Sequence, residues 1–441
     1  RPDRRQRERL DMQKRHKPEE QAIEILRGND RGGYTVPTPG LYPYQWNWDS
    51  VFAALGFAVF DRGRAWQEIE TLFEGQWADG MVPHIVFRKN DPSYFPGPDI
   101  WKSNTDPRSS GHSQPPVAAS VILTLAKTGG KDDVARARRL FPKLIASHRW
   151  WHDYRDPDRT GLVGIIHPWE SGRDNCPDWD IGMDRIVVPD DLGPYHRRDT
   201  DHVDADERPT VQQYDRFLTI VKFGRECGWN HRKIAAEGPF FMADPGVQFT
   251  LMRADRDLLE LGRLLGETFD EGEIEGWIEL SQQGALSMWN GDIEAFVARD
   301  LRVGGFSTAL TNASMLAFYA GAGTGDQLGL LAGHGREILD ICEYGFPSWD
   351  PRHEAFECRR YWRGPVWSVM NYMIAIGLEE HGYAGMAERL RNDCRRLPEL
   401  SGFYEYFDPL SGEGLGGPDF TWTAAIYLAL GRGLDPALAK V

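Results

Sequence analysis

The sequence contains little cysteine, and its spacing suits neither a metal site nor a disulfide framework. Its five cysteines lie far apart along the chain and include no CxxC pair: Cys176, Cys227, Cys342, Cys358 and Cys394. An odd number of widely separated cysteines favours free thiols in a reducing compartment.

Long apolar runs and an excess of positive charge are also missing. No stretch reaches the roughly 18 residues of a membrane span, and the basic N-terminus lacks the apolar segment of a signal peptide. The 441-residue chain has a formal net charge of -15, which argues against nucleic acid or an anionic membrane as its main partner. We therefore expect a cytoplasmic protein whose partner is a small molecule. No oligomeric state is predicted.

Alternation with a period of two never lasts more than a few residues, whereas helical apolar spacing recurs along the whole chain. Short strands could occur around 82–88 and 162–166. An apolar helix is expected over VFAALGFAVF, with Asp49 or Ser50 as its cap. Thirteen segments are candidates for helices, which gives roughly twelve helices in pairs: 17–27, 51–60, 65–76, 117–127, 132–153, 210–227, 248–265, 271–289, 308–321, 327–342, 365–381, 383–397 and 420–430.

These helices form pairs with short connections on one side and long loops on the other. The pattern predicts an all-α fold, an (α/α)6 toroid in which an inner ring of helices lies inside an outer ring. No composition break marks a linker, so residues 1–441 are predicted to be a single domain. Two long irregular segments, 80–114 and 175–209, are expected to form the functional face. An α-solenoid is the alternative, but the chain shows no internal repeat.

Carboxylic acids and aromatic rings gather on irregular backbone in HPWESGRDNCPDWD, residues 167–180. Cleavage of a glycosidic bond needs one carboxylic acid and a second carboxylate, and rings can cover the apolar faces of a sugar. Asp174 or Glu170 could be the acid, and Glu405 or Glu413 the base. The residues alone do not choose within either pair, since Glu170 could cap a turn and Glu413 could be an exposed turn acid.

Five further loop clusters combine aromatic and polar residues beside Gly or Pro. They are LYPYQWNWDS (41–50), SYFPGPDIW (93–101), HSQPP (112–116), YWRGPVW (361–367) and GFYEYFDPLSGEGLG (402–416). Each cluster lies beside a predicted helix end. Together they predict one ring-shaped mouth assembled from separate loops.

In this combination the chain resembles glycoside hydrolase family 63, and more narrowly its bacterial and plant members that hydrolyse mannosylglycerate or glucosylglycerate. WESGRDN, YWRGPVW and the Y-E-Y-F-D-P run, in that order, carry the resemblance. Trehalases and processing α-glucosidase I share the toroid and the ESGxD motif. The resemblance implies an inverting hydrolase without a cofactor, with Asp174 as general acid and Glu405 as base.

The resemblance also implies how a substrate would be held. Glycerate would be bound by Arg208, Tyr214, Tyr94 and Gln114, in keeping with the preference of a carboxylate for a guanidinium. The sugar subsite would consist of Tyr42, Trp48, Asp49, Trp169, Gly172, Tyr361, Trp362 and Trp367.

The acid-rich run DTDHVDADERP, residues 199–209, lies outside these motifs. It lacks the spacing of an EF-hand, so a solvated or salt-bridged loop is expected and no catalytic metal is predicted. Arg208 could simply pair with these acids. Cys176 also departs from the relatives, which carry Ser there. Two other functions therefore stay open: a family-63-type α-glucosidase or trehalase-like enzyme acting on a neutral disaccharide, and a non-catalytic sugar-binding or epimerase toroid.

Overall fold

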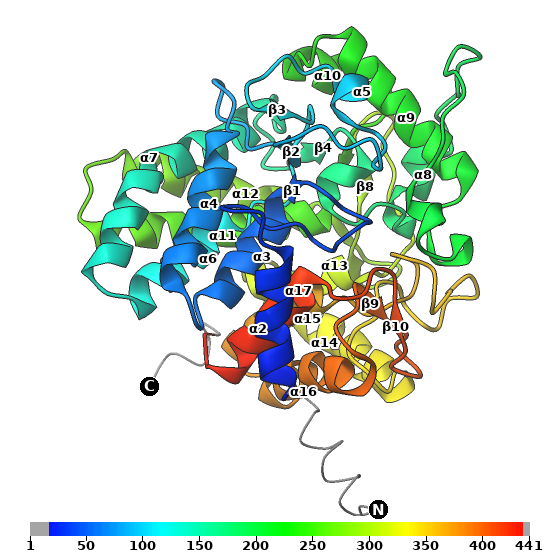
Figure 1. Ribbon diagram of the computed structural model, residues 1–441. Coiled ribbons are helices and arrows are strands. Elements are labelled where there is room, and N and C mark those ends of the chain that lie inside the picture. Colours follow the sequence, from blue (N-terminus) through cyan, green and yellow to red (C-terminus); the bar gives the residue numbers. More distant parts are fainter. Residues whose placement is uncertain (1–16, 435–441) are drawn as a thin grey trace, which may run out of the picture.

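The computed structural model describes residues 17–434, and this part of the chain is mostly helical (Figure 1). The basic N-terminal segment lies outside the described residues. Within them, no helix is both long enough and apolar enough to cross a membrane.

The centre of the fold consists of helices that are buried on nearly every side. They are α3 (Asn47–Phe57), α6 (Ala118–Thr128), α11 (Pro245–Leu265), α13 (Asn312–Ala320), α15 (Ser368–Glu380) and α17 (Thr421–Gly431). Each packs against the next in this order, and α17 packs against α3. Every residue of α3 and of α13 is buried. A helix that is apolar all round is stable only when other elements surround it.

Amphipathic helices cover this central set. They are α2 (Pro18–Asn29), α4 (Arg62–Glu74), α7 (Lys131–Tyr154), α12 (Glu271–Leu286), α14 (Gly325–Ile341) and α16 (Ala384–Ser401). Among them, α2 packs on α17, α4 on α3, α7 on α6, α12 on α11, α14 on α13, and α16 on α15. Each has one buried stripe, because its apolar residues recur with helical spacing. The central and covering helices are all predicted by the sequence to within a few residues, which confirms the helix pairing.

Several predicted helix ends are wrong by three or four residues; for example, α13 begins at Asn312 where 308 was expected, and α16 ends at Ser401 where 397 was expected. α3 begins at Asn47 and follows Trp46, so Asp49 lies inside its first turn and does not cap it. An acid in this position is favoured by the helix dipole. The helix predicted over 271–289 ends at Leu286, and Trp289 opens a short strand.

The two ends of the described chain lie side by side, with α2 against α17 (Figure 1). Asn29 Nδ2 donates hydrogen bonds of 2.9 Å to the carbonyl of Asp419 and to the hydroxyl of Thr421. The Thr421 hydroxyl in turn donates to the carbonyl of Val36. The first helix of the described residues is therefore fixed in place by the last one among them.

Short antiparallel strands lie in the loops. One sheet has the order β1 (Gln45–Trp46), β2 (Ile85–Phe87), β3 (Arg108–Ser109), and another β4 (Gly164–Ile165), β5 (Met242–Ala243), β8 (Arg299–Asp300). The strands predicted around 82–88 and 162–166 are β2 and β4. Two hairpins pair β6 (Trp289–Asn290) with β7 (Ala295–Phe296), and β9 (Tyr406–Phe407) with β10 (Gly414–Leu415).

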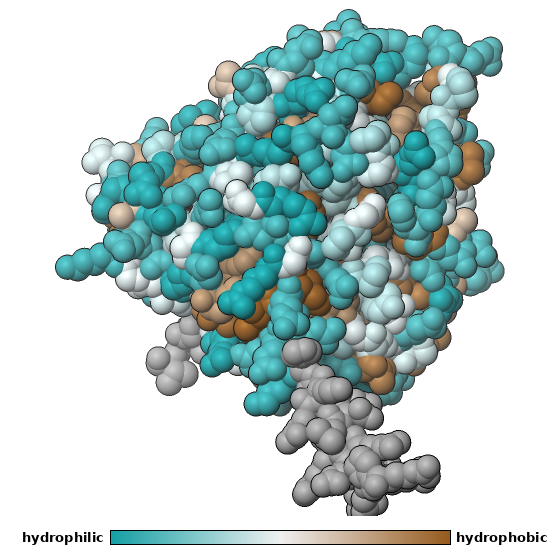
Figure 2. All heavy atoms as spheres, viewed as in Figure 1, coloured by the Kyte–Doolittle hydropathy of each residue, from teal (hydrophilic) through white to brown (hydrophobic). Residues whose placement is uncertain are grey.

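The remaining helices lie between α4 and α11. The longest, α9 (Val211–Glu226), begins after Thr210, whose hydroxyl accepts from the Gln213 amide. The sequence reading missed the short helices α5 (Pro98–Trp101), α8 (Asp180–Met183) and α10 (His231–Glu237), and the single turns η1 (Pro168–Ser171), η2 (Pro177–Trp179), η3 (Asp199–Asp201) and η4 (Ala205–Glu207). They are too short to give a periodic signal. The face shown in Figure 2 is mostly hydrophilic, with apolar residues in small separate groups.

Candidate active site

The aromatic and polar loop clusters line one pocket, which encloses about 770 Å³ including its opening to solvent. Every predicted site residue except Trp367 lines it: Tyr42, Trp48, Asp49, Tyr94, Gln114, Trp169, Gly172, Asp174, Arg208, Tyr214, Tyr361, Trp362 and Glu405. Residues far apart in the sequence therefore meet in one cavity, as the clusters predicted.

Trp367 does not line the pocket, so its predicted place in the sugar subsite needs correction. Its ring stacks on Trp362 with centroids 3.7 Å apart and planes 6° apart. Its indole nitrogen donates to the carbonyl of Tyr361 across 3.1 Å. Trp367 therefore packs behind Trp362 and supports its ring, because Trp362 lies between Trp367 and the cavity.

The sequence reading missed several lining residues, among them Trp46, His84, Phe95, Asp199, Phe420 and Trp422. Trp46 lies inside the QWNWDS cluster and could have been included with it. Asp199 belongs to the acid-rich run, which the sequence predicts to be a solvated or salt-bridged loop. Trp422 lies on the apolar helix α17 and resembles a core residue. His84 stands in the long loop 80–114 without a motif to mark it.

Asp174 is held at the pocket by the loop that surrounds it. Gly172 ends η1 in the left-handed region, at φ 69°. The buried Arg173 then pairs with Asp178 at 2.9 Å and with Asp244 at 2.6 Å. Burial raises the pKa of Asp174 to about 7, against the opposing charge of Arg208 and with the help of Glu405. Asp174 therefore keeps a proton close to neutral pH.

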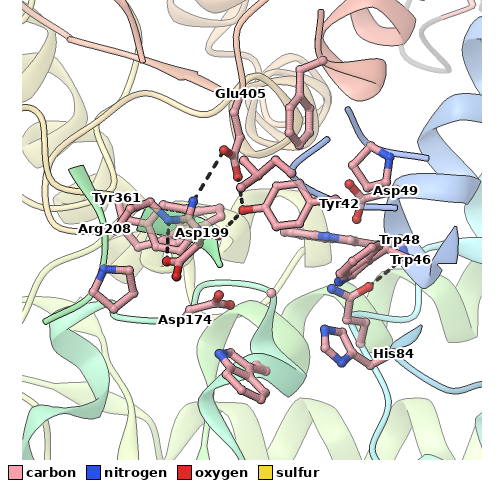
Figure 3. A pocket seen from close by; sticks show the side chains of 18 of the residues that line it. Tyr42, Trp46, Trp48, Asp49, His84, Asp174, Asp199, Arg208, Tyr361 and Glu405 are labelled. Atoms are coloured by element: carbon pink, nitrogen blue, oxygen red, sulfur yellow. Dashed lines mark hydrogen bonds and ion pairs between the residues drawn. The ribbon is translucent and has the colours of Figure 1, made fainter. Parts of the chain in front are cut away.

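Glu405 lies just before β9 and is almost completely buried. The Tyr42 hydroxyl donates to its Oε1 across 3.0 Å, and the Gly417 amide donates to its Oε2 across 3.2 Å. Arg208 Nη1 lies 3.6 Å from Oε2. Burial raises the pKa of Glu405, and Arg208 together with the two hydrogen bonds opposes that rise. In Figure 3 Glu405 and Asp174 lie on opposite sides of the pocket.

The other two candidate acids lie elsewhere. Glu170 is fully buried beneath the loop and accepts from Arg155 at 2.7 and 2.9 Å. Its oxygens also accept from the amides of Ser113 and Ile166 at 3.0 Å. Glu413 is exposed and pairs with Arg359 at 2.6 Å. Of the four candidates, the pocket contains Asp174 and Glu405.

Arg208 places a buried cation in the same pocket. Its guanidinium lies over the ring of Tyr361, 4.0 Å from the centroid. Its Nε donates to Asp199 Oδ2 across 3.2 Å, so the expected pairing with the acid-rich run is confirmed. Its buried Nη1 has no hydrogen-bond partner among residues 17–434. A buried donor without a partner is costly, and a carboxylate in the pocket would supply that partner.

The walls of the pocket are mainly aromatic. Trp48 meets Trp422 edge to face, with centroids 5.6 Å apart, and its backbone amide donates to Gln114 Oε1 across 3.2 Å. A Cβ on Gly172 would lie 2.6 Å from the Trp48 ring, so only glycine allows this approach. Burial also raises the pKa of Asp49 well above its ordinary value.

The other glycerate candidates line the same pocket as Arg208. Tyr94 packs edge to face on Trp46 with centroids 5.3 Å apart. The Tyr214 hydroxyl donates to the carbonyl of Phe95 across 3.1 Å. The structure therefore brings the predicted sugar-facing and glycerate-facing residues into one pocket.

The described residues contain no group of three His, Cys, Asp or Glu side chains that could hold a metal ion. In the acid-rich run, Asp199 pairs with Arg197 at 2.6 Å and Asp201 with His196 at 3.0 Å. Asp199 and Asp201, whose spacing resembles that of a metal-binding loop, are therefore engaged in ion pairs. All five cysteines are free.

Residues 42–423 match the family described as the mannosylglycerate hydrolase MGH1-like glycoside hydrolase domain. The chain is 46% identical over 412 residues to a mannosylglycerate hydrolase of Thermus thermophilus, covering 92% of this chain and 99% of that protein. It is 45% identical over 409 residues to a mannosylglycerate hydrolase of Selaginella moellendorffii, covering 92% and 83%. It is 34% identical over 435 residues to a glucosylglycerate hydrolase of Mycolicibacterium hassiacum, covering 92% and 96%.

Solved structures agree with the sequence relatives. A crystal structure of the family 63 mannosylglycerate hydrolase from Thermus thermophilus in complex with Tris and D-glycerate has a TM-score of 0.91 at 45% identity, covering 94% of this chain and 100% of that one. Neutral trehalase from Saccharomyces cerevisiae has a TM-score of 0.58 at 17% identity, covering 90% and 73%. At that identity the trehalase shows a shared fold alone.

Proposed function

Because the chain belongs to glycoside hydrolase family 63, with its mannosylglycerate hydrolase-like members, we propose that it cleaves 2-O-α-mannosylglycerate, 2-O-α-glucosylglycerate or both to the free sugar and glycerate. The observation that carries the substrate proposal is Arg208. Its buried cation, with Nη1 lacking a hydrogen-bond partner, shares a pocket with Asp174 and Glu405. A neutral disaccharide has no carboxylate of its own to offer that donor a hydrogen bond.

Asp174 is the proposed general acid and Glu405 the proposed base of an inverting mechanism. A pKa of about 7 lets Asp174 protonate the departing glyceryl oxygen. Glu405 would take a proton from a water that attacks the anomeric carbon from the other face of the sugar. The placement of the two carboxyls on opposite sides of the pocket in Figure 3 supports these roles.

The proposed subsites follow the resemblance to the family and divide the lining residues into two groups. Arg208 would bind the glycerate carboxylate, with Tyr94, Gln114 and Tyr214 around it. Tyr42, Trp48, Asp49, Trp169, Gly172, Tyr361 and Trp362 would hold the sugar. Aromatic faces suit the apolar faces of a pyranose, and the buried carboxyl of Asp49 can bond hydroxyl groups.

For the architecture, we propose that the cycle of contacts from α3 to α17 is the inner ring of an (α/α)6 toroid and that 1–441 is a single domain. One continuous hydrophobic core reaches from Ala22 to Ala429, which supports a single unit. The segments 80–114 and 175–209 both contribute lining residues and would form its active-site face. The free thiols also support a proposed cytoplasmic location.

The activity is tested by incubating the protein with both glycosylglycerates, trehalose and kojibiose. We expect release of glycerate from at least one of the first two compounds, and early NMR spectra should show the β-anomer of the sugar. Turnover of a neutral disaccharide with neither glycosylglycerate cleaved would refute the substrate proposal. Early appearance of the α-anomer would refute inversion.

The role of Arg208 is tested by Arg208→Ala with Arg198→Ala as matched control. Arg198 is an exposed arginine in the same segment, near Asp201. Removing one partner of a buried charge pair costs about 2–5 kcal/mol. We expect Arg208→Ala to lower kcat/KM for a glycosylglycerate far more than for a neutral glycoside. An equal loss of kcat/KM on both substrates would mean that Arg208 does not bind the substrate carboxylate.

A further inference from the structure

Arg208 lies between two carboxylates, and they differ in how they hold it. Asp199 Oδ2 accepts from its Nε at 3.2 Å, whereas Glu405 Oε2 lies 3.6 Å from its Nη1, beyond hydrogen-bond distance. We propose that Asp199 is a positioning residue that holds Arg208 away from the catalytic base and leaves the Nη1 side of its guanidinium for the substrate carboxylate. This inference rests on the proposed function of Arg208 and Glu405.

Asp199 is itself fixed rigidly. Both its oxygens accept from Arg197, at 3.0 and 2.6 Å. Arg197 in turn donates to the carbonyl of Pro209 across 2.6 Å and lies over the ring of Tyr214, 4.6 Å from the centroid. A bidentate arginine–carboxylate pair sets geometry as well as charge. Arg197 therefore fixes the position of the Asp199 carboxylate relative to Arg208.

The charges alternate along this chain of contacts: Arg197, Asp199, Arg208, Glu405. In a poorly solvated pocket the attraction between Arg208 and either carboxylate is strong. Without the negative charge of Asp199, Glu405 would be the nearest anion to Arg208. The guanidinium would then move onto Glu405, and Nη1 would become occupied. A base paired directly with a guanidinium holds a proton less readily.

The acid-rich run thus contains one acid that differs from its neighbours. The Asp199 side chain is 13% exposed, whereas that of Asp206 is 93% exposed. Asp201 pairs with a half-exposed His196 at the surface. Among these three acids, Asp199 lines the pocket. This difference gives Asp199 a role that the composition of the run does not reveal.

Several charged or titratable groups act on Glu405, and Asp199 is one of them. Its negative charge raises the pKa of Glu405, while Arg208 lowers it. Five other groups have charges that couple to Glu405. They are Tyr42 in the loop before β1, Asp49 on α3, Asp174 in the loop after η1, Tyr361 in the loop before α15, and Tyr406 on β9. Removing the Asp199 charge and letting Arg208 approach both lower the pKa of Glu405. The acid limb of the rate profile should then move to lower pH.

The test compares Asp199→Asn with Asp190→Asn, a matched control at an exposed acid of the same segment. The acid limb of kcat/KM is measured on whichever glycoside the wild type cleaves. We expect Asp199→Asn to move this limb down by at least half a pH unit and to reduce the preference for a glycosylglycerate over a neutral glycoside by at least tenfold. Asp190→Asn should change neither, and Asp199→Glu should restore part of the preference.

An unchanged acid limb, or one that moves to higher pH, would overturn the inference, even if Asp199→Asn lowers the thermal midpoint. If Asp199→Asn does not fold, Arg197→Lys tests the same link, because it keeps the charge and loses the bidentate grip on Asp199. It should move the acid limb in the same direction by a smaller amount, and no movement would overturn the inference. A wild type that cleaves no glycosylglycerate refutes the proposed substrate, whereas the acid limb still decides the link between Asp199 and Glu405.

Discussion

The hydroxyl of Tyr42 donates a hydrogen bond of 3.0 Å to Oε1 of Glu405, joining two residues that are 363 positions apart in the chain. This bond stabilises the ionised carboxylate, because a phenol donates more strongly to a charged acceptor than to a neutral one. It lies inside the pocket and therefore links the first loop cluster directly to the proposed base.

Tyr42→Phe should move the acid limb of the kcat/KM profile to higher pH. The hydrogen bond lowers the pKa of Glu405, so its loss raises that pKa, and the base becomes protonated at a higher pH. A hydrogen bond to a charged group contributes about 1.5–3 kcal/mol. Tyr44→Phe is the control, since its hydroxyl bonds the carbonyl of Asp91. The direction is opposite to that expected for Asp199→Asn, and a shared direction would contradict one of the two assignments.

Asp174 should set the alkaline limb of the same profile. A general acid works only while protonated, and the pKa of Asp174 is about 7, so activity should fall as the pH rises through about 7. Asp174→Asn should reduce kcat by about 10²–10⁴-fold and leave the thermal midpoint close to that of the wild type. Glu413→Gln, an exposed acid, should keep full activity. Comparable losses in the two variants would contradict the assignment of the acid.

Glu170→Gln should lower the free energy of unfolding, with a smaller effect on the rate of hydrolysis. Removing the charge leaves Arg155 buried without its ionic partner, which costs about 3–5 kcal/mol. Glu273→Gln breaks the bidentate pair with Arg149 at the surface, where such pairs contribute about 0–1 kcal/mol. Urea unfolding of both variants gives the comparison. Equal stabilities would mean that the buried pair contributes no more to the free energy of unfolding than the surface pair.

Gly172→Ala should raise KM and lower the free energy of unfolding by more than Gly193→Ala. Both glycines have left-handed backbone, at φ 69° and 80°, where a side chain costs about 1–2 kcal/mol. At Gly172 the new Cβ also meets the Trp48 ring at 2.6 Å, whereas at Gly193 nothing lies within 4 Å. Steady-state kinetics and thermal unfolding measure the two effects. A KM that stays at the wild-type value would mean that Trp48 does not hold the substrate.

The helices and the loop clusters could be predicted from the sequence because each is a local pattern. The choice between Glu170 and Asp174 could not, since both acids stand in one five-residue stretch and differ only in what lies beneath them. Trp362 and Trp367 pose the same problem, because two stacked rings look alike in sequence and one faces the cavity. The sequence does not distinguish Asp199 from its acidic neighbours, because its contacts with Arg197 and Arg208 exist only in the folded chain.

The pairing of α2 with α17 has a consequence for the order in which the enzyme is made. Asp174 and Arg208 leave the ribosome long before Glu405, and Asp419 and Thr421, which hold Asn29 in place, follow Glu405. Until Glu405 has been made, a nascent chain carries the proposed acid and the buried cation without the proposed base. We therefore expect hydrolysis only after α17 has been made and has packed against α2.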